Sequence, residues 1–287
     1  MSYTNGLDKP TDYFNTVLYT GNGSTGHGIT GVGFQPDWVW AKQRSSANSH
    51  QIYDSVRGAT KYIGSDVNNA EQTLSEGLQS FDSDGFTVGN GTYINGSSST
   101  YASWNWLAGG TGVSNTDGSI TSTVSASTTA GFSIVSYTGD GSSSSTVGHG
   151  LGVAPKMVIC KERNNADLWQ VRHESLSSNY NLWLHASDRA YNMTNEVNNG
   201  GIADLSSSST FGFVQGVQDV NSVNQSSSTY IAYCFAEKKG YSKFGSYTGN
   251  ANADGTFIQC GFLPSSILLK YDAISNWIMF DNKRSPF

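Results

Sequence analysis

Tyr19-Thr20-Gly21-Asn22-Gly23 recurs along the chain as Tyr137-Thr138-Gly139-Asp140-Gly141 and again as Tyr247-Thr248-Gly249-Asn250. A proline follows each tyrosine after 17, 18 and 17 residues, at Pro36, Pro155 and Pro264. Each proline leads into an apolar run that ends on a lysine: Trp38-Val39-Trp40-Ala41-Lys42, Met157-Val158-Ile159-Cys160-Lys161 and Ile267-Leu268-Leu269-Lys270. Similar phrases in a fixed order are typical of a chain built from repeated units. They predict stacked modules rather than an enzyme built around a pocket.

Composition narrows the fold class. The 287 residues are enough for two domains of ordinary size. Only 13% of them are charged, against roughly 25% in average proteins, whereas the chain has 33 glycines and 12% aromatic residues. Such a sequence is typical of short strands joined by tight turns. With turn signals about every 8 to 12 residues, it predicts an all-β protein of tandem β-sandwich modules, jelly-roll or concanavalin-like.

The repeated phrases divide the chain into five parts. We expect an N-terminal arm at residues 1–11, a first sandwich at residues 12–112 and a second at residues 131–239. Residues 113–130 connect the two, as a linker or, in the favoured interpretation, as an edge strand, because Ile120 and Val124 lie at even spacing. Residues 240–287 are predicted to form a partial third copy.

A closing strand separates the complete copies from the partial one. Ser97-Ser98-Ser99-Thr100-Tyr101 returns as Ser226-Ser227-Ser228-Thr229-Tyr230, and residues 100–107 alternate as a half-buried strand does. The third copy lacks this phrase. Half a sandwich leaves sheet edges and an apolar face open. We therefore expect either that the sequence is a fragment of a longer chain or that a neighbour holds the partial copy.

Charge and hydropathy argue against nucleic-acid and membrane partners, and the cysteines indicate the redox compartment. A net charge of −6 and a pI near 5.2 disfavour nucleic acid, which requires clustered lysine and arginine. No stretch of about 18 apolar residues predicts a membrane span, and the N-terminus does not resemble a secretory signal. The three cysteines, Cys160, Cys234 and Cys260, are odd in number and widely spaced, so no disulfide framework and a reducing cytoplasm are expected.

No motif predicts catalysis or a metal. Gly-His-Gly occurs at His27 and His149 without further ligands nearby, so both histidines are expected in loops, hydrogen-bonded to the backbone. Residues 81–86 resemble the opening of a calcium loop but lack its closing acidic residue, which favours a turn. Glu71 and Glu76 are the nearest approach to the paired carboxyls of a glycosidase, without the expected Asp between them. We therefore predict no enzyme activity, no cofactor and no metal site.

The seven tryptophans suggest where a ligand would bind. Trp38 and Trp40 share one strand face, as do Trp104 and Trp106, and such pairs are typical of a core. Trp169 and Trp277 lie near the starts of strands beside polar loops. They are the candidate ligand-binding residues, where an aromatic ring would stack on a sugar.

Longer phrases resemble a known family. The chain is similar, over almost its whole length, to a virion-associated repeat domain of unassigned function from tailed phages of marine bacteria, cyanophages included. The phrases that carry the resemblance are residues 33–37, 53–60, 80–86, 148–156 and 241–249. It implies a concanavalin-like sandwich in fibres, tail appendages or particle-surface proteins, and it brings no catalytic residues. Residues 282–287 resemble the middle of a repeat in longer relatives, which favours the fragment interpretation.

The resemblance yields a functional expectation. We expect a phage virion structural protein, a tail fibre, appendage or particle-surface subunit that contributes to host-surface attachment. It would be assembled in the cytoplasm of the bacterial host, with other virion proteins and further copies of itself as partners. One alternative is a lectin-like module that binds a host cell-surface glycan. Another is a capsid decoration protein without a ligand.

Overall fold

The regular secondary structure of the described residues is almost entirely β-strand, and every pairing between named strands is antiparallel. The computed structural model describes residues 7, 9–195, 200–216 and 221–284. The protein is all-β, as predicted, and its sheets pack as β-sandwiches. Most of the expected N-terminal arm, residues 1–6 and 8, lies outside the described residues.

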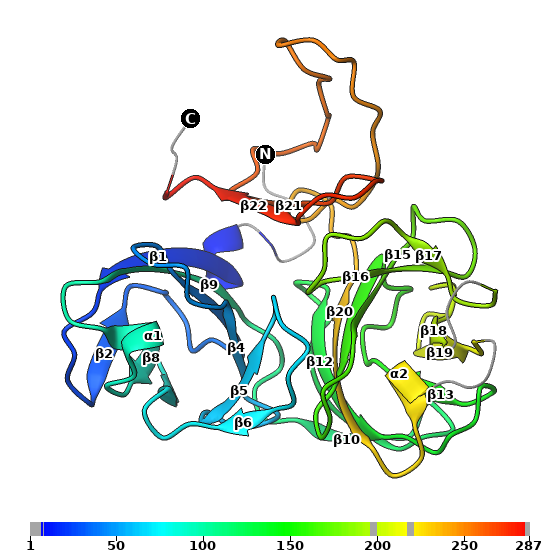
Figure 1. The fold of residues 1–287 in the computed structure, drawn as a ribbon, viewed down its shortest axis with the longest axis horizontal. Helices are drawn as coiled ribbons and strands as arrows, with labels where there is room; N and C mark the ends of the chain where they lie inside the picture. The colour runs from blue at the N-terminus through cyan, green and yellow to red at the C-terminus, as the bar shows by residue number, and fades with distance from the viewer. Residues whose placement is uncertain (1–6, 8, 196–199, 217–220, 285–287) are drawn as a thin grey trace.

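The first sandwich, residues 10–106, pairs a six-stranded sheet with a three-stranded one. The large sheet has the order β1-β9-β3-β4-β5-β6 and the small one β2-β8-β7 (Figure 1). The elements are η1 (Pro10–Asp12), β1 (Phe14–Thr20), β2 (His27–Thr30), β3 (Trp38–Gln43), β4 (Gln51–Asp54), β5 (Lys61–Gly64), β6 (Gln72–Thr73), β7 (Leu78–Asp82), β8 (Gly85–Val88), α1 (Thr92–Asn95) and β9 (Thr100–Trp106).

The second sandwich, residues 113–235, has the same plan with two strands added. Its large sheet has the order β10-β11-β12-β20-β14-β15-β16-β17 and its small one β13-β19-β18. The elements are β10 (Val113–Asn115), β11 (Ser122–Ser127), β12 (Phe132–Thr138), β13 (Thr146–Gly148), β14 (Met157–Glu162), β15 (Trp169–His173), β16 (Tyr180–Trp183), β17 (Tyr191–Asn192), β18 (Gly201–Ile202), β19 (Thr210–Val214), α2 (Asn221–Asn224) and β20 (Thr229–Phe235). The added strands β10 and β11 fall within the connecting residues 113–130 and occupy the edge of the sheet.

The two large sheets face each other, so the molecule has four layers (Figure 1). One apolar core lies inside the first sandwich, around Val39, Tyr53 and Phe86. A second lies inside the second sandwich, around Tyr137 and Phe211. A third, which includes residues from both large sheets, fills the space between them.

This arrangement changes the expected role of strand β9. Its alternating sequence predicted a strand with one face exposed to solvent, but five of its seven residues are buried. Trp104 packs in the core between the large sheets, while Tyr101 lies on the opposite face. The polar residues are small enough to be buried with partners, as Asn105 shows by donating to the carbonyl of Asn15 at 3.0 Å. The prediction of a half-buried strand was therefore wrong, because the second sandwich and the C-terminal segment cover the remaining face.

The C-terminal segment, residues 240–284, contributes one hairpin and a long loop. Strands β21 (Ser266–Leu269) and β22 (Ile278–Asp281) form a sheet of two strands. In Figure 1 this hairpin lies across the top of the space between the two sandwiches, and the preceding loop extends away from the body. Trp277 donates its indole N–H to the carbonyl of Trp183 at 3.0 Å, and Ser275 donates its backbone N–H to the carbonyl of Ser187 at 2.7 Å.

The recurring Tyr-Thr-Gly turn packs closely against the loop before the closing strand. A Cβ on Gly21 would lie 2.3 Å from the carbonyl oxygen of Gly96, and one on Gly139 would lie 2.3 Å from that of Gln225. A side chain cannot fit against backbone at that distance. At Gly249, in the third occurrence, a Cβ would meet nothing within 4 Å.

Alanine substitutions at these glycines should therefore differ sharply. Gly139→Ala is expected to lower the free energy of unfolding by about 1 to 3 kcal/mol, because the backbone must shift to admit a methyl group. Gly249→Ala serves as the matched control and should change it by less than about 0.5 kcal/mol. Urea titrations followed by tryptophan fluorescence measure both. Equal effects of the two variants would contradict the close packing at Gly139.

Candidate functional site

The two tryptophans predicted to bind a ligand do not form a surface site. Trp169 is 0% exposed and donates its indole N–H to the carbonyl of Gly64, in the first sandwich, at 2.8 Å. The expectation that Trp169 lies at the surface is therefore wrong. Trp277 is partly buried and packs against the core between the large sheets.

The other residues singled out in the sequence have structural partners. The imidazole of His27 is hydrogen-bonded to the side chain of Asn95 at 2.9 Å, and that of His149 accepts the backbone N–H of Leu151 at 3.2 Å. Glu71 is bound by two arginines, and Glu76 accepts from the hydroxyl of Ser75 at 3.3 Å. Cys160 and Cys234 are buried free thiols.

The two large sheets pack against each other across an extensive interface. Its apolar part is aromatic: the ring of Trp38 lies 4.6 Å from that of Tyr233, 5.5 Å from Phe132 and 5.9 Å from Phe235, between centroids. Trp38 belongs to β3 in the first sandwich, and the other three residues belong to β12 and β20 in the second. Rings in such contact stabilise an interface beyond the area that they bury.

A buried ionic network joins the same two sheets. Asp54 accepts from the Nε of Arg57 at 2.5 Å and from the Tyr233 hydroxyl at 2.8 Å. Both charged side chains are fully buried. Arg57 also donates to the carbonyl of Ile52 at 3.0 Å and to the Tyr233 hydroxyl at 3.4 Å. The charges of Asp54 and Arg57 therefore compensate each other within the first sandwich. The hydroxyl of Tyr233, from the second sandwich, is hydrogen-bonded to both.

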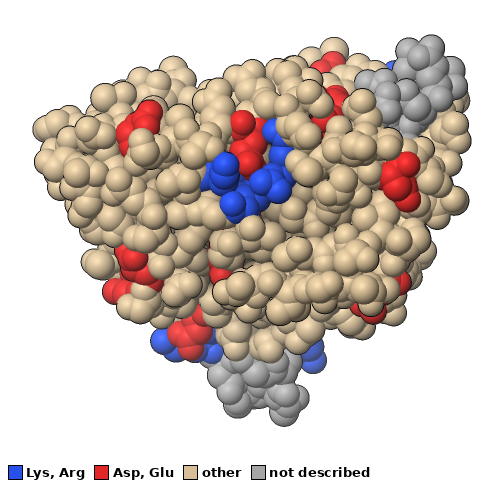
Figure 2. All heavy atoms as spheres, turned by 90° about the horizontal axis from the view of Figure 1, so that it is seen from below, with Lys and Arg blue, Asp and Glu red and all other residues tan. Residues whose placement is uncertain are grey.

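Glu71 extends the network to the rim of the interface. Arg163 donates to its two oxygens at 2.8 and 3.0 Å, and Arg57 donates at 3.3 Å. The backbone N–H of Glu71 donates to the carbonyl of Arg163 at 2.8 Å. Since Arg163 follows β14, these bonds cross from one sandwich to the other. Seen from below in Figure 2, most of that face is uncharged, with a small mixed group of acidic and basic side chains near its middle.

The surroundings of Glu71 and Arg57 favour the ionised form of each side chain. Burial would raise the pKa of Glu71, but the hydrogen bonds of Arg163 and the charge of Arg57 outweigh it and keep that pKa below its usual range. Burial would lower the pKa of Arg57, but the charge of Asp54 raises it further. Burial raises the pKa of Tyr233 well above its usual value. Glu71 is thus ionised at neutral pH, whereas the general acid of a glycosidase must hold a proton there.

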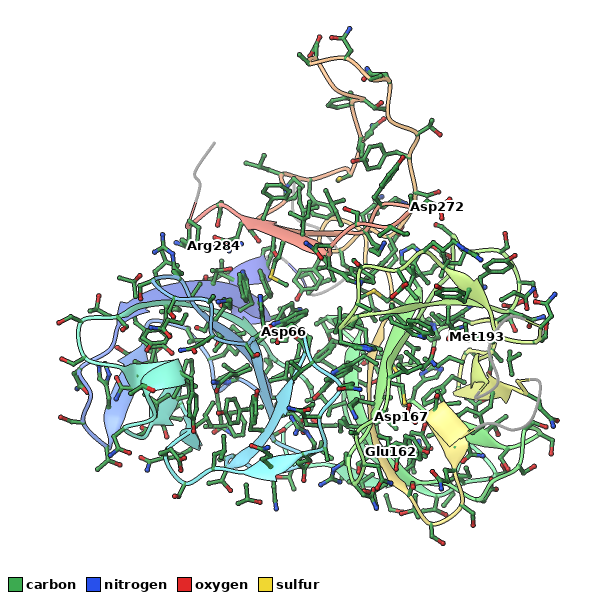
Figure 3. All side chains as sticks on the ribbon, viewed as in Figure 1. Asp66, Glu162, Asp167, Met193, Asp272 and Arg284 are labelled. Carbon is green, nitrogen blue, oxygen red and sulfur yellow. The ribbon has the colours of Figure 1, made fainter. Side chains whose placement is uncertain are left out.

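The C-terminal segment repeats this polar contact on the first sandwich. Asp281 accepts from the Nε of Arg284 at 2.5 Å and from the indole N–H of Trp104 at 3.1 Å. Arg284 donates to the carbonyl of Met279, as Arg57 does to that of Ile52. Its guanidinium lies 4.8 Å from the Trp104 ring. Figure 3 labels Arg284, which lies between the C-terminal hairpin and the top of the first sandwich.

The two contacts use corresponding positions. In the strand registers, Asp54 lies opposite the first residue of β3, and Asp281 opposite the first residue of β21. Trp104 and Tyr233 are both the fifth residue of their closing strand, β9 and β20. An Asp-x-x-Arg pair therefore meets an aromatic N–H or O–H of another unit twice. The spacing was visible in the sequence at residues 54–57 and 281–284, but nothing there indicated what the pair would contact.

The second sandwich departs from the pattern. His173 lies opposite the first residue of β14, in the position that Asp54 has opposite β3. Leu176, three residues later, takes the place of the arginine. The ring of His173 lies 6.1 Å from that of Phe244 in the C-terminal segment. Here an aromatic contact replaces the ionic one.

A neutral histidine lies where the C-terminal hairpin meets the first sandwich. The Nδ1 of His50 accepts from the indole N–H of Trp40 at 3.0 Å, and its ring stacks on Trp104. Burial lowers the pKa of His50 to about 4; Asp66 opposes this shift, and Lys42 and Arg284 add to it. The folded protein therefore binds the proton more weakly than the unfolded chain does.

Acid should weaken the fold through this residue. The stability due to neutral His50 is complete above its unfolded pKa of about 6.5 and is lost as pH falls toward 4, by about 1.4 kcal/mol per pH unit. A His50→Asn variant, which keeps an acceptor for Trp40, should show a smaller loss between about pH 7 and about pH 4.5. Urea titrations of both proteins at the two pH values measure the difference. Parallel losses would show that His50 does not titrate in this range.

Metal and membrane features are not seen in the part of the chain that the structure describes. No group of three or more His, Cys, Asp or Glu residues is placed to hold a metal ion among the described residues. None of the described helices has the length and apolar character needed to cross a bilayer.

Comparison with known proteins identifies a family. Neither the curated proteins nor the solved structures searched contain a match to the chain. One family does match, over residues 9–287, and its description is "Domain of unknown function (DUF7483)". Because the match covers nearly the whole chain, both sandwiches and the C-terminal hairpin included, the protein belongs to the DUF7483 family.

Proposed function

We propose that this protein is a structural subunit of a bacteriophage particle, built from tandem copies of one β-sandwich and placed in a tail fibre, an appendage or the particle surface. The observation that carries the proposal is the recurring contact of an Asp-x-x-Arg pair with an aromatic side chain of a neighbouring unit. The same kind of contact is made twice between different units of the chain, which is a device for assembly rather than for catalysis.

Local geometry supports the tandem copies. Both large sheets contain six strands in the corresponding order. The lysine that ends each apolar run donates to the carbonyl of the next residue, at 2.7 Å for Lys42, 2.6 Å for Lys161 and 2.8 Å for Lys270. Of the sequence phrases that resemble virion-associated repeats, residues 53–60 include the end of β4, and residues 80–86 include parts of β7 and β8. Tandem copies of one module would explain both the shared strand order and the shared lysine hydrogen bonds.

Particle composition tests the proposal directly. Virions purified from a host culture that produces this protein should contain it in a fixed ratio to the major particle proteins, measured by quantitative mass spectrometry. A reconstruction of the same particles should then place it in a fibre, an appendage or the shell. Its absence from purified virions would overturn the proposal.

Glycan binding receives less support than assembly. Trp169, one of its two candidate residues, is buried, and the indole N–H of Trp277 is already bonded to Trp183. A glycan array probed with the folded protein tests host attachment separately from particle assembly. Retention on a defined glycan, lost in a Trp277→Ala variant that still folds, would restore the lectin-like alternative.

A further inference from the structure

Besides the Asp-x-x-Arg contact, a second contact between units occurs twice. Trp169 of the second sandwich donates its indole N–H to the carbonyl of Gly64 in the first sandwich at 2.8 Å. Trp277 of the C-terminal segment, the third unit, donates its indole N–H to the carbonyl of Trp183 in the second sandwich at 3.0 Å. In both cases the donor belongs to the later unit in the chain and the acceptor to the unit before it.

The strand registers show that these contacts use corresponding positions. Trp169 lies opposite Lys161, the lysine that ends the apolar run of its unit. The last residue of β21 pairs with the first residue of β22, which places Trp277 beside Lys270 in the same way. The two acceptors are the last residues of β5 and β16, strands that hold the same place in their large sheets. The second unit therefore contacts the first as the third unit contacts the second.

The Asp-x-x-Arg position makes a contact at each of the three boundaries between units. The first sandwich presents its pair to Tyr233 of the second, and the C-terminal segment presents its pair to Trp104 of the first. At the remaining boundary His173 holds the corresponding position of the second sandwich, and its ring lies 6.1 Å from that of Phe244 in the third unit. The contacts therefore run from the first unit to the second, from the second to the third and from the third back to the first.

The first sandwich carries a histidine where the other two units carry the tryptophan. His50 comes directly before β4, as Trp277 comes directly before β22. Its ring stacks on Trp104, and the guanidinium of Arg284 lies 4.8 Å from the same Trp104 ring. This position of the first unit therefore lies at the boundary with the third unit, as Trp169 of the second lies at the boundary with the first.

The three units share one apolar core. Trp38 of the first sandwich and Ile159 of the second belong to it, and Trp277 and Met279 of the C-terminal hairpin pack against it. In Figure 1 the two sandwiches and the hairpin surround this common centre. Units in a row would bury a separate core at each boundary, whereas units placed around an axis bury a single one.

We propose that the three units form a closed ring with pseudo-threefold symmetry, in which the partner of each Asp-x-x-Arg position is the next unit of the same chain. A contact between unlike surfaces either closes into a ring or continues as a helix, and here the third step returns to the first unit. The inference rests on the proposed tandem copies and names what their recurring contact binds. One chain then takes the form of a trimer, and these contacts do not join separate chains into a fibre.

Distances between corresponding positions test the ring. Ser46, Asn165 and Ile274 are exposed, and each lies four residues after the lysine of its unit. Each pair of these positions is changed to cysteine in a Cys260→Ser background of the full 287-residue chain and labelled with nitroxides. Pulsed electron spin resonance should give three similar distances, because threefold symmetry makes the positions the corners of an equilateral triangle. A distance between residues 46 and 274 much longer than the other two would indicate a row or a helix of units and would overturn the proposal.

The labelling has its own control. Cys160 and Cys234 are buried, so the Cys260→Ser protein without added cysteines should take up no nitroxide. Labelling at the three exposed positions alone then reports the arrangement of the units.

The boundary that closes the ring is tested by breaking it. Asp281→Ala/Arg284→Ala removes the contact of the third unit with Trp104 and should broaden the distribution of distances between residues 46 and 274, while that between residues 46 and 165 stays unchanged. Lys283→Ala, an exposed position between the two, is the matched control and should change neither. An unaltered 46–274 distribution in the double variant would contradict a closing contact.

Light scattering separates contacts within the chain from contacts between chains. The parent should remain a monomer of 30.7 kDa as its concentration rises. Self-association of the parent that the Asp281→Ala/Arg284→Ala variant abolishes would show that the pair joins separate molecules, and would overturn the proposal. Absence of the protein from virions would leave the three distances unchanged, so this inference and the proposed function fail separately.

Discussion

Replacing Arg57 by methionine is expected to lower the free energy of unfolding by about 4 kcal/mol. The side chain is fully buried and donates to the carboxylate of Asp54, to Glu71 and to the carbonyl of Ile52. Methionine keeps most of the volume but leaves the carboxylate of Asp54 buried without its cation. The uncompensated charge, rather than the lost packing, accounts for most of the cost. Chemical denaturation measures the change.

Two controls identify the cause. Arg284→Met removes the corresponding arginine of the C-terminal segment, which is 26% exposed whereas Arg57 is fully buried. Its partner Asp281 is buried, so the variant should still lose stability, but by a smaller amount of about 2 kcal/mol because water reaches the arginine side of the pair. The double variant Asp54→Asn/Arg57→Met removes the buried charge as well and should recover part of the lost stability. If the double variant were less stable than Arg57→Met, the uncompensated carboxylate would not be the source of the effect.

Replacing Trp38 by alanine is the second large perturbation, with an expected loss of about 4 kcal/mol. Its ring fills the centre of the interface, against Tyr233 and Phe132 of the other sandwich. The cavity would lie between two sheets, so the variant should also weaken their coupling. We expect the parent to unfold in a single transition and the variant to unfold in two, one for each sandwich.

The matched control for Trp38 is Trp277→Ala. Trp277 packs against the same core but is partly exposed, so its loss should cost about 1 to 2 kcal/mol and leave the coupling of the sandwiches intact. Calorimetry and tryptophan fluorescence together report both the size and the number of transitions. If the free energy of unfolding of Trp38→Ala lay within about 1 kcal/mol of that of the parent, the result would contradict a packed interface.

Much of the strand layout could be predicted from the sequence because it rests on local signals. The apolar run after Pro36 coincides with β3, and residues 100–106 with β9. Trp38 and Trp40 are buried, as their shared face predicted. Turn chemistry and periodicity act over a few residues, so they are readable without knowledge of the tertiary structure.

The interface between the sandwiches could not be predicted in this way. Trp169 is buried and donates its indole N–H to the carbonyl of Gly64, which lies 105 positions earlier in the chain. The partner of Asp54 on the second sandwich, Tyr233, is 179 positions away. A polar loop beside Trp169 suggested exposure, but contact with a distant unit overrides that local signal. The candidate site is made of such contacts between distant residues, and the sequence analysis predicted none of them.

The contact between an Asp-x-x-Arg pair and an aromatic side chain has two unlike sides, and this has a consequence for symmetry. The C-terminal hairpin presents its pair to Trp104 of the first sandwich, and the first sandwich presents its own pair to Tyr233 of the second. Such a head-to-tail contact joins two different surfaces, so a two-fold rotation cannot relate its two sides. Repeated between identical units, it generates closed rings or open helical filaments, never an isologous dimer.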